Sequence, residues 1–250
     1  MDLVPIGKKK ASIFNGFCDY HDSKLFSPIE NEDIVFTEEQ NFLITYRSFA
    51  HSFHQISEIY NYYLSDAEFI KEFPPDYLEA HTRYTEWAIV KLSKYKMILD
   101  NLMESQNYSS INYHYRVVEP FVPIAASSIL RTKYTYKNKY IYDGENYANI
   151  ILNVIPDGKR TVILISQFKK DELGKVFFDE FKELSNEQFT HAISSLILFC
   201  TENTFFSPKL WDKFSTTDKQ RLLEEKNFCT HYGGRLNRFF KSNYDIFKYQ

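Results

Sequence analysis

The sequence is poor in the residues that mark several common protein classes. Its 250 residues include 3 cysteines, an odd number at wide spacing, which does not form a disulfide framework. The start of the chain has no apolar stretch of the kind found in a secretory signal. No apolar run approaches the roughly 20 residues that a membrane helix needs. We therefore expect a cytoplasmic protein without a membrane partner.

An excess of one charge is also absent. The 30 basic and 33 acidic residues give a net charge of −3, which argues against a protein held on DNA by bulk charge. A local basic patch could still bind nucleic acid. Aromatic residues are abundant instead, with 23 Phe and 19 Tyr, and tyrosine often lines interfaces. We expect a protein partner or a homo-oligomer, with nucleic acid as a further candidate partner.

The order of the sequence patterns predicts a single α+β domain over residues 1–250. Residues 1–36 are irregular and carry the motifs, 37–105 form a helical hairpin, 112–168 form a sheet, and 171–250 are helical. The fold class that follows is an antiparallel sheet in the middle of the chain. We expect an N-terminal helical hairpin and C-terminal helices to pack on it.

Two long helices are predicted in the first half of the chain. Thr37 and Gln40 have the spacing of a capping box at the first helix start. An apolar stripe then recurs at helical spacing. It consists of Phe42, Tyr46, Phe49, Phe53, Ile56, Tyr60 and Tyr63. Pro74 and Pro75 separate it from a second helix over 76–105, and a short connection favours an antiparallel hairpin.

The sheet region contains one strong hairpin signal. Two apolar runs, 148–155 and 161–166, flank the turn residues Pro156 to Lys159. Residues 134–142 are rich in tyrosine and also predict a strand. After the sheet, Ser185 and Gln188 form a second capping box that opens a helix over 186–202.

The densest cluster of reactive side chains lies at residues 18–22. Cys18 and His21 are three residues apart, so one turn of chain can direct both toward a single cation, and zinc is the candidate cofactor. Two ligands do not make a complete site, and Cys229 with His231 could supply the others. The alternative is a buried thiol beside a histidine that is hydrogen-bonded to the backbone.

His21 and Asp22 could instead belong to a catalytic centre in which a metal activates water. Arg47 begins a polar stripe on the first long helix and could bind a phosphate group beside them. The candidate catalytic residues are therefore His21, Asp22 and Arg47. The alternative is that this stripe is the solvated face of an amphipathic helix. No glycine-rich phosphate loop or nucleophile elbow is present, so we assign no cofactor-binding residues.

Basic and aromatic residues also alternate near the end of the chain. They are Arg235, Arg238, Phe239, Phe240 and Lys241. Such a segment could grip a nucleic-acid backbone while an aromatic ring stacks on a base. It could equally be a helix whose basic side faces water while its phenylalanines close the core.

Several segments together resemble a group of uncharacterised bacterial proteins in which a Gly-Phe-Cys-x-x-His-Asp segment precedes a Phe-Leu-x-x-Tyr-Arg helix. The first segment runs here from Gly16 to Asp22 and the second from Phe42 to Arg47. Further similar positions are Ile6-Gly7, Ala11-Ser12, Phe14, Leu25-Phe26, Pro28-Ile29-Glu30, Asn153 to Pro156, Cys200 to Asn203, Ser207-Pro208 and Trp211. Longer members carry an upstream cysteine segment that looks like part of a treble-clef or HNH-type zinc unit, and this chain does not contain it. The resemblance implies a bacterial protein linked to mobile elements or phage defence, without assigning an activity.

Two hypotheses from different classes remain open. The first is a phage-defence component that acts on nucleic acid through a centre with His21 and Asp22, in which Cys18 is a structural or metal ligand. The second is a non-catalytic regulatory or binding subunit of a defence or toxin–antitoxin type complex. The dense polar cluster favours an enzyme, whereas the near-neutral charge favours a binding subunit.

Overall fold

The fold is that of a computed structural model, which describes residues 4–7, 16–65, 71, 74–201, 203–232 and 245–249, with the backbone alone for 225–232. The chain divides into two compact units, one of residues Phe14–Tyr108 and one of Met1–Ile13 with Ser109–Gln250. We call them the helical unit and the sheet unit. Helices together with an antiparallel sheet confirm the α+β class. That residues 1–250 form one domain stays a prediction.

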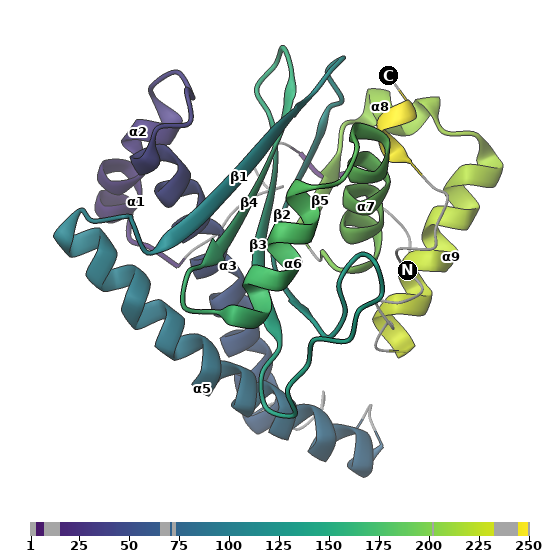
Figure 1. Cartoon of the computed structure of the whole chain (residues 1–250). Coiled ribbons are helices and arrows are strands. Elements are labelled where there is room, and N and C mark those ends of the chain that lie inside the picture. Colours follow the sequence, from purple (N-terminus) through teal and green to yellow (C-terminus); the bar gives the residue numbers. More distant parts are fainter. Residues whose placement is uncertain are drawn as a thin grey trace. The chain divides into compact units, whose positions relative to one another are not determined.

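Two long helices, α3 (Glu38–Ser65) and α5 (Pro75–Ser105), dominate the helical unit (Figure 1). They pack against each other and are antiparallel, because contacts pair opposite ends of the two helices. Near the start of α3, Tyr46 donates a hydrogen bond from its hydroxyl to Asp100 Oδ1 at 3.0 Å. Near its end, the ring centroid of Tyr63 lies 6.4 Å from that of His81. The predicted helical hairpin is confirmed.

Two short helices, α1 (Asp19–Leu25) and α2 (Ser27–Glu30), precede α3 in a region expected to be irregular. A helix of seven residues is too short to leave a clear periodic pattern in the sequence. Pro28 in the first turn of α2 is compatible with this helix, because the first turn needs no backbone donor. The motif residues 18–30 are therefore carried on helical turns.

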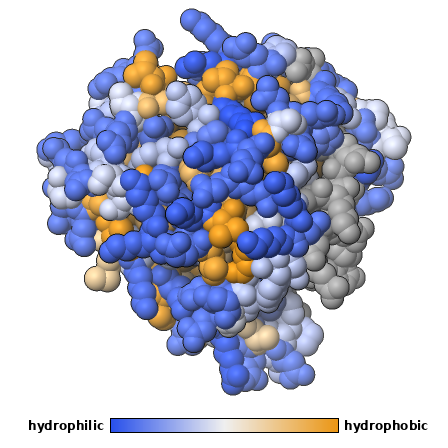
Figure 2. All heavy atoms as spheres, in the orientation of Figure 1, coloured by the Kyte–Doolittle hydropathy of each residue, from blue (hydrophilic) through white to orange (hydrophobic). Residues whose placement is uncertain are grey.

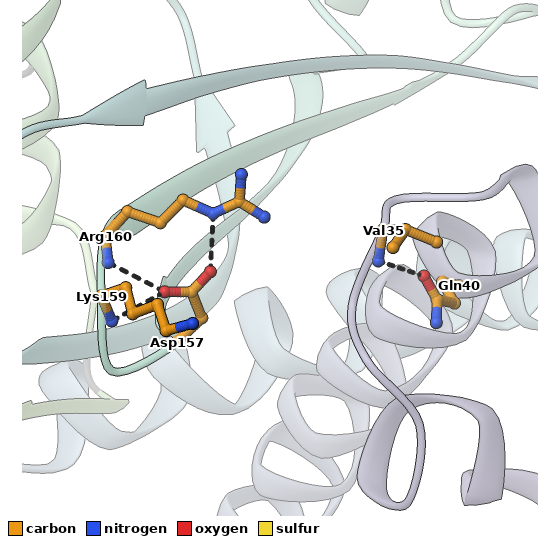
Figure 3. Close-up of polar contacts among 5 residues, drawn as sticks. All are labelled: Val35, Gln40, Asp157, Lys159 and Arg160. Carbon is orange, nitrogen blue, oxygen red and sulfur yellow. Dashed lines mark hydrogen bonds and ion pairs between the residues drawn. The ribbon is translucent and has the colours of Figure 1, made fainter.

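The start of α3 forms half of its predicted capping box. Thr37 Oγ1 accepts a hydrogen bond from the backbone N–H of Gln40 at 3.1 Å, as expected. The Gln40 side chain, however, accepts from the Val35 N–H at 2.9 Å (Figure 3). Phe36, between Val35 and Thr37, has a left-handed φ of 59°. Gln40 also donates to the carbonyls of Pro28 and Asp33, so this one buried side chain ties the loop before α3 to α2.

The sheet unit is built on five antiparallel strands in the order β1-β4-β3-β2-β5. The strands are β1 (Ile111–Val118), β2 (Ile124–Thr132), β3 (Ala148–Pro156), β4 (Thr161–Phe168) and β5 (Asn203–Phe206). Every residue of β4 is buried, which agrees with its position between β1 and β3 and with its apolar sequence.

The turn between β3 and β4 confirms the strongest hairpin prediction. Gly158 has a φ of 87°, which suits the tight turn. Asp157 closes it by accepting from the N–H groups of Lys159 and Arg160 and from Arg160 Nε, at 2.7–3.1 Å (Figure 3). Desolvation acts to raise the pKa of Asp157, but the hydrogen bonds from Arg160 and Lys159 outweigh it and lower the pKa.

The helices of the sheet unit share one apolar core with its strands. Helix α6 (Glu172–Lys182) packs on β3 and β4, and α7 (Asn186–Phe199) packs against α9 (Thr216–Tyr232). The predicted capping box of Ser185 and Gln188 opens α7. The largest fully buried side chains of these two helices are Phe177, Phe181 and Phe189. Helix α8 (Pro208–Lys213) and the 3-10 turn η1 (Ile246–Lys248) complete the same apolar cluster.

Two segments of this unit differ from the prediction. Residues 134–142 form a loop with a single bridge between Tyr134 and Tyr140, and not a strand. Residues 203–206, expected to follow a helix end, form the edge strand β5, which pairs with β2. Strand β5 depends on a partner distant in the sequence, which local patterns do not record.

Within the described part of the chain, no helix combines the length and apolar character needed to span a bilayer. Figure 2 shows a face on which hydrophilic side chains predominate and hydrophobic ones form separate patches.

Candidate functional site

Cys18 and His21 contact each other at the start of α1. Cys18 is the residue before the helix, and its carbonyl accepts from the backbone N–H of Asp22 at 2.9 Å. The three-residue spacing brings His21 back to the same side of the turn, so that His21 Nδ1 lies 3.1 Å from Cys18 Sγ. Both side chains are exposed, and the ring of Tyr20 lies at an angle beside the imidazole, with centroids 5.5 Å apart. The thiol and imidazole are therefore accessible to a ligand from outside.

Arg47 joins the two short helices to α3. Its Nη1 lies 2.6 Å from Glu30 Oε1, and its Nη2 lies 3.6 Å from Asp22 Oδ2. Its guanidinium also stands over the ring of Phe26, with Cζ 4.9 Å from the centroid. One guanidinium thus binds a carboxylate from α1 and another from α2. We call Asp22, Glu30 and Arg47 the carboxylate clamp.

An aromatic layer supports the clamp. Phe26 is fully buried, and its ring meets that of Phe17 edge-on at 5.2 Å and that of Tyr46 at 6.4 Å. Burial, and then the hydrogen bond to Asp100, raises the pKa of Tyr46, so its hydroxyl stays a neutral donor. Lys96 Nζ lies 2.6 Å from the other oxygen of Asp100. These contacts fix the part of α3 that carries Arg47.

The three candidate catalytic residues do not form one contact group. Asp22 and Arg47 are joined in the carboxylate clamp, whereas the contacts of His21 are to Cys18 and Tyr20. The described side chains contain no group of three or more His, Cys, Asp or Glu residues arranged to hold a metal ion. The pair of Cys18 and His21 is the part of the predicted metal site that the structure places together.

Other predicted residues lie beyond the described structure. The side chains of Cys229 and His231 are outside the described residues, although the backbone of both belongs to α9. The basic and aromatic tail from Arg235 to Lys241, including Arg238, also lies outside them.

The polar stripe that follows Arg47 on α3 includes His51 and His54. Burial, and then the charge of nearby His54, lowers the pKa of His51, which favours its neutral form. Arg47 itself is about one-third exposed, since its side chain has 37 % relative accessibility, and it is already bound to two carboxylates. A phosphate group would therefore have to compete with Asp22 and Glu30 for Arg47.

Sequence reasoning assigned no role to Glu30 or Phe26. Both belong to the stretch that resembles the bacterial group, but nothing in local spacing connects them with Arg47, which lies 17 residues beyond Glu30. The ion pair forms because α2 and α3 lie side by side, as their contacts show. Opposite charges on two segments of a sequence do not by themselves predict an ion pair. The pair can be assigned once the packing of the two helices is known.

The sulfur of Cys18 is a soft ligand atom and the imidazole nitrogen of His21 a borderline one, so the pair can bind a metal ion. The carboxylate clamp, with two carboxylates and a guanidinium, lies beside them.

No protein family model matches this sequence, and the searches for similar curated proteins and similar solved structures gave no match.

Proposed function

We propose that the protein is a zinc-binding protein that acts on nucleic acid, and that Cys18 and His21 supply two of the zinc ligands. The observation that carries this proposal is the 3.1 Å distance between Cys18 Sγ and His21 Nδ1. On a tetrahedral zinc ion, bonds of about 2.3 Å to sulfur and about 2.0–2.1 Å to nitrogen put the two ligand atoms about 3.6 Å apart. A small rotation of either exposed side chain would reach this separation.

The pair supplies half of a four-ligand set. That Cys229 and His231 supply the others stays a prediction from the sequence, because their side chains lie outside the described residues. In this assignment His21 holds the metal, and the carboxylate clamp positions the segment that carries it. A zinc ion held by three protein ligands would leave its fourth position to a water molecule, whose pKa zinc would lower so that it could act as a nucleophile in phosphodiester hydrolysis. The resemblance to proteins linked with mobile elements and phage defence supports nucleic acid as the target.

Zinc content tests the metal assignment. Protein purified without chelators should contain zinc, and the variants Cys18→Ser and His21→Gln should lose most of it. Cys200→Ser and His54→Gln serve as matched controls, because each removes the same kind of side chain away from the site. A zinc content near zero in the wild type, or equal zinc in all five proteins, would contradict the proposal.

A non-catalytic binding or regulatory subunit is the second candidate, and the carboxylate clamp favours it. Arg47 already has two carboxylate partners at 2.6 and 3.6 Å, so it is less suited to bind a substrate phosphate. Incubating zinc-loaded protein with end-labelled single-stranded and duplex DNA and RNA separates the candidates. Cleavage that His21→Gln abolishes supports an enzyme. Full zinc without cleavage of any of these substrates supports a binding subunit.

A further inference from the structure

The loop between β2 and β3 gathers tyrosines and lysines on the surface of the sheet unit. Residues 133–147 contain five tyrosines and three lysines. The tyrosines are Tyr134, Tyr136, Tyr140, Tyr142 and Tyr147, and the lysines are Lys133, Lys137 and Lys139. We call residues 133–147 the Tyr–Lys loop, and β2 and β3, which it connects, are labelled in Figure 1. None of its residues belongs to the proposed zinc site.

Backbone hydrogen bonds hold the first part of the loop in a hairpin-like shape. The N–H of Thr135 donates to the carbonyl of Lys139 at 2.9 Å, and the N–H of Ile141 donates to that of Lys133 at 2.8 Å. Asn138 turns the chain with a left-handed φ of 62°. Ile141 is buried in the core of the sheet unit and anchors the loop. A ligand would therefore meet a surface that is already ordered, which lowers the entropic cost of binding.

The tyrosine rings form a connected series along the loop. Tyr134 and Tyr140 meet edge-on with centroids 5.1 Å apart, and Tyr140 meets Tyr142 at 6.3 Å. The Tyr142 and Tyr147 rings follow at 4.9 Å. Tyr140 contacts two rings of this series and is 55 % exposed. By contrast, Tyr136 packs on the buried Phe181 at 6.3 Å and helps to close the core. Tyr140 is thus the ring best placed for a planar ligand.

Positive charge accompanies the rings. Lys133 Nζ stands over Tyr142 and Tyr147, 4.5 and 5.3 Å from their centroids. Lys139 is exposed, and its ammonium group has no partner among the described residues. Lys137 forms an ion pair with Glu183 at 3.7 Å, but both side chains are more than 60 % exposed, so the pair is weak.

Acidic groups also lie near the loop. Both oxygens of Asp143 accept hydrogen bonds from the turn at residues 145–146, and those bonds, led by that from the Asn146 side chain, lower its pKa to about 2. Glu180 accepts from the N–H of Lys137 at 2.7 Å. Glu145 is exposed. Lys137 therefore lies next to Glu180 and Glu183, whereas Lys139, on the other side of Asn138, makes no acidic contact among the described residues. The positive charge at the tip of the loop rests mainly on Lys139.

We infer that the Tyr–Lys loop binds single-stranded nucleic acid, with a base stacked on Tyr140 and phosphates near Lys137 and Lys139. Exposed aromatic rings interleaved with basic side chains are the combination by which proteins hold single strands without reading their sequence. A duplex keeps its bases stacked inside, so it could use the lysines and not the ring. The inference rests on the proposed function for its nucleic-acid ligand and places the contact in the sheet unit.

Fluorescence anisotropy with a labelled oligo(dT) and a duplex of equal length tests the loop in the full chain. The wild type should bind the single strand more tightly than the duplex. Tyr140→Ala should weaken single-strand binding by about 5- to 100-fold, and Tyr140→Phe, which keeps the ring, should bind like the wild type. Tyr62→Ala removes another exposed tyrosine, 52 % accessible, in the helical unit and should also bind normally.

A salt series tests the lysines. Lys137→Ala/Lys139→Ala should reduce the slope of log affinity against log salt by about 1.4, since each neutralised phosphate on a single strand contributes about 0.7. Lys169→Ala/Lys170→Ala removes two exposed lysines elsewhere in the sheet unit and should leave the slope unchanged.

Three outcomes would overturn the inference. They are no binding of oligo(dT) at low salt, equal binding of single strand and duplex, and unchanged binding by Tyr140→Ala. If polyglutamate bound with the same dependence on Tyr140 and the lysines, the partner would be an acidic protein. Zinc content measured on the same samples keeps the two proposals apart. Zinc-loaded wild type that fails to bind oligo(dT) contradicts the loop alone, whereas zinc-free protein that binds it contradicts the metal site alone.

Discussion

At the scale of single residues, the helical unit is organised by one guanidinium. Arg47 binds Glu30 and Asp22 and covers the ring of Phe26. Each of these contacts is modest at a partly exposed position, because water competes for both charges. Their combined effect is to fix α1 and α2 against α3, and with them the Cys18–His21 pair.

Arg47→Ala should therefore lower the free energy of unfolding by about 1 kcal/mol, from the lost ion pairs and the lost cation–π contact. Urea denaturation followed by fluorescence measures the change. Arg83→Ala is the matched control, because Arg83 forms a more exposed ion pair with Glu79 on α5, at 2.7 Å, and should change stability by less than about 0.5 kcal/mol. Equal effects of the two substitutions would show that Arg47 has no special structural role.

A second residue-scale feature is the half-buried His114 on β1. Its ring faces the edges of Phe178 and Phe189, and its Nε2 lies 3.2 Å from Arg116 Nε. Burial, together with the charges of Arg116 and Lys182, lowers its pKa from 6.5 to about 4. Between these two values the unfolded chain binds a proton that the folded chain does not bind. The stability of the folded state therefore decreases as the pH falls through this range.

His114→Gln should make stability less dependent on pH, because it removes the group that gains a proton on unfolding. Urea midpoints measured from about pH 7 to about pH 5 should fall less steeply in this variant than in the wild type. An identical slope in His114→Gln and the wild type would exclude His114 as the source.

At the scale of elements, the sequence predicted the helix and turn features that depend on residues close together in the chain. Four predicted features are set within a few residues, and all four are present. They are the stripe on α3, the two prolines at the start of α5, the Ser185 capping box and the β3–β4 turn. Strand β5 was missed because it depends on pairing with β2 in the folded sheet. Residues 134–142 were predicted as a strand from their composition, but they form a loop with one isolated bridge. The candidate site divides in the same way: the three-residue spacing predicted the contact of Cys18 with His21, whereas the contact of Glu30 with Arg47 needed helix packing.

The apolar stripe of α3 makes an element-scale prediction. Phe42 and Phe49 are buried at 0 % and 2 % exposure, whereas Ile59 near the end of the helix is 38 % exposed. Phe49→Ala should lower the free energy of unfolding by about 3–5 kcal/mol, because it leaves a cavity where a large side chain was buried. Leu64→Ala, at a position 59 % exposed, should change it by less than about 0.5 kcal/mol. A loss below about 1 kcal/mol for Phe49→Ala in urea denaturation would contradict its place in the core.

At the scale of the whole molecule, the chain divides its candidate chemistry between two compact units. The helical unit carries the Cys18–His21 pair and the carboxylate clamp. The sheet unit carries the Tyr–Lys loop. In the proposed function, the helical unit supplies the zinc ligands Cys18 and His21, and the further inference assigns nucleic-acid binding to the sheet unit. Substitutions can remove the Cys18–His21 pair without changing the Tyr–Lys loop, and others can change the loop without changing the pair.

The zinc X-ray absorption spectrum of the purified protein tests the proposed metal ligands most directly. The wild type should show sulfur at about 2.3 Å and nitrogen at about 2.0–2.1 Å from zinc. Cys18→Ser should reduce the sulfur signal and His21→Gln the nitrogen signal, or each should lose the metal. A wild-type protein without zinc, or a zinc spectrum that neither substitution changes, would show that Cys18 and His21 are not zinc ligands.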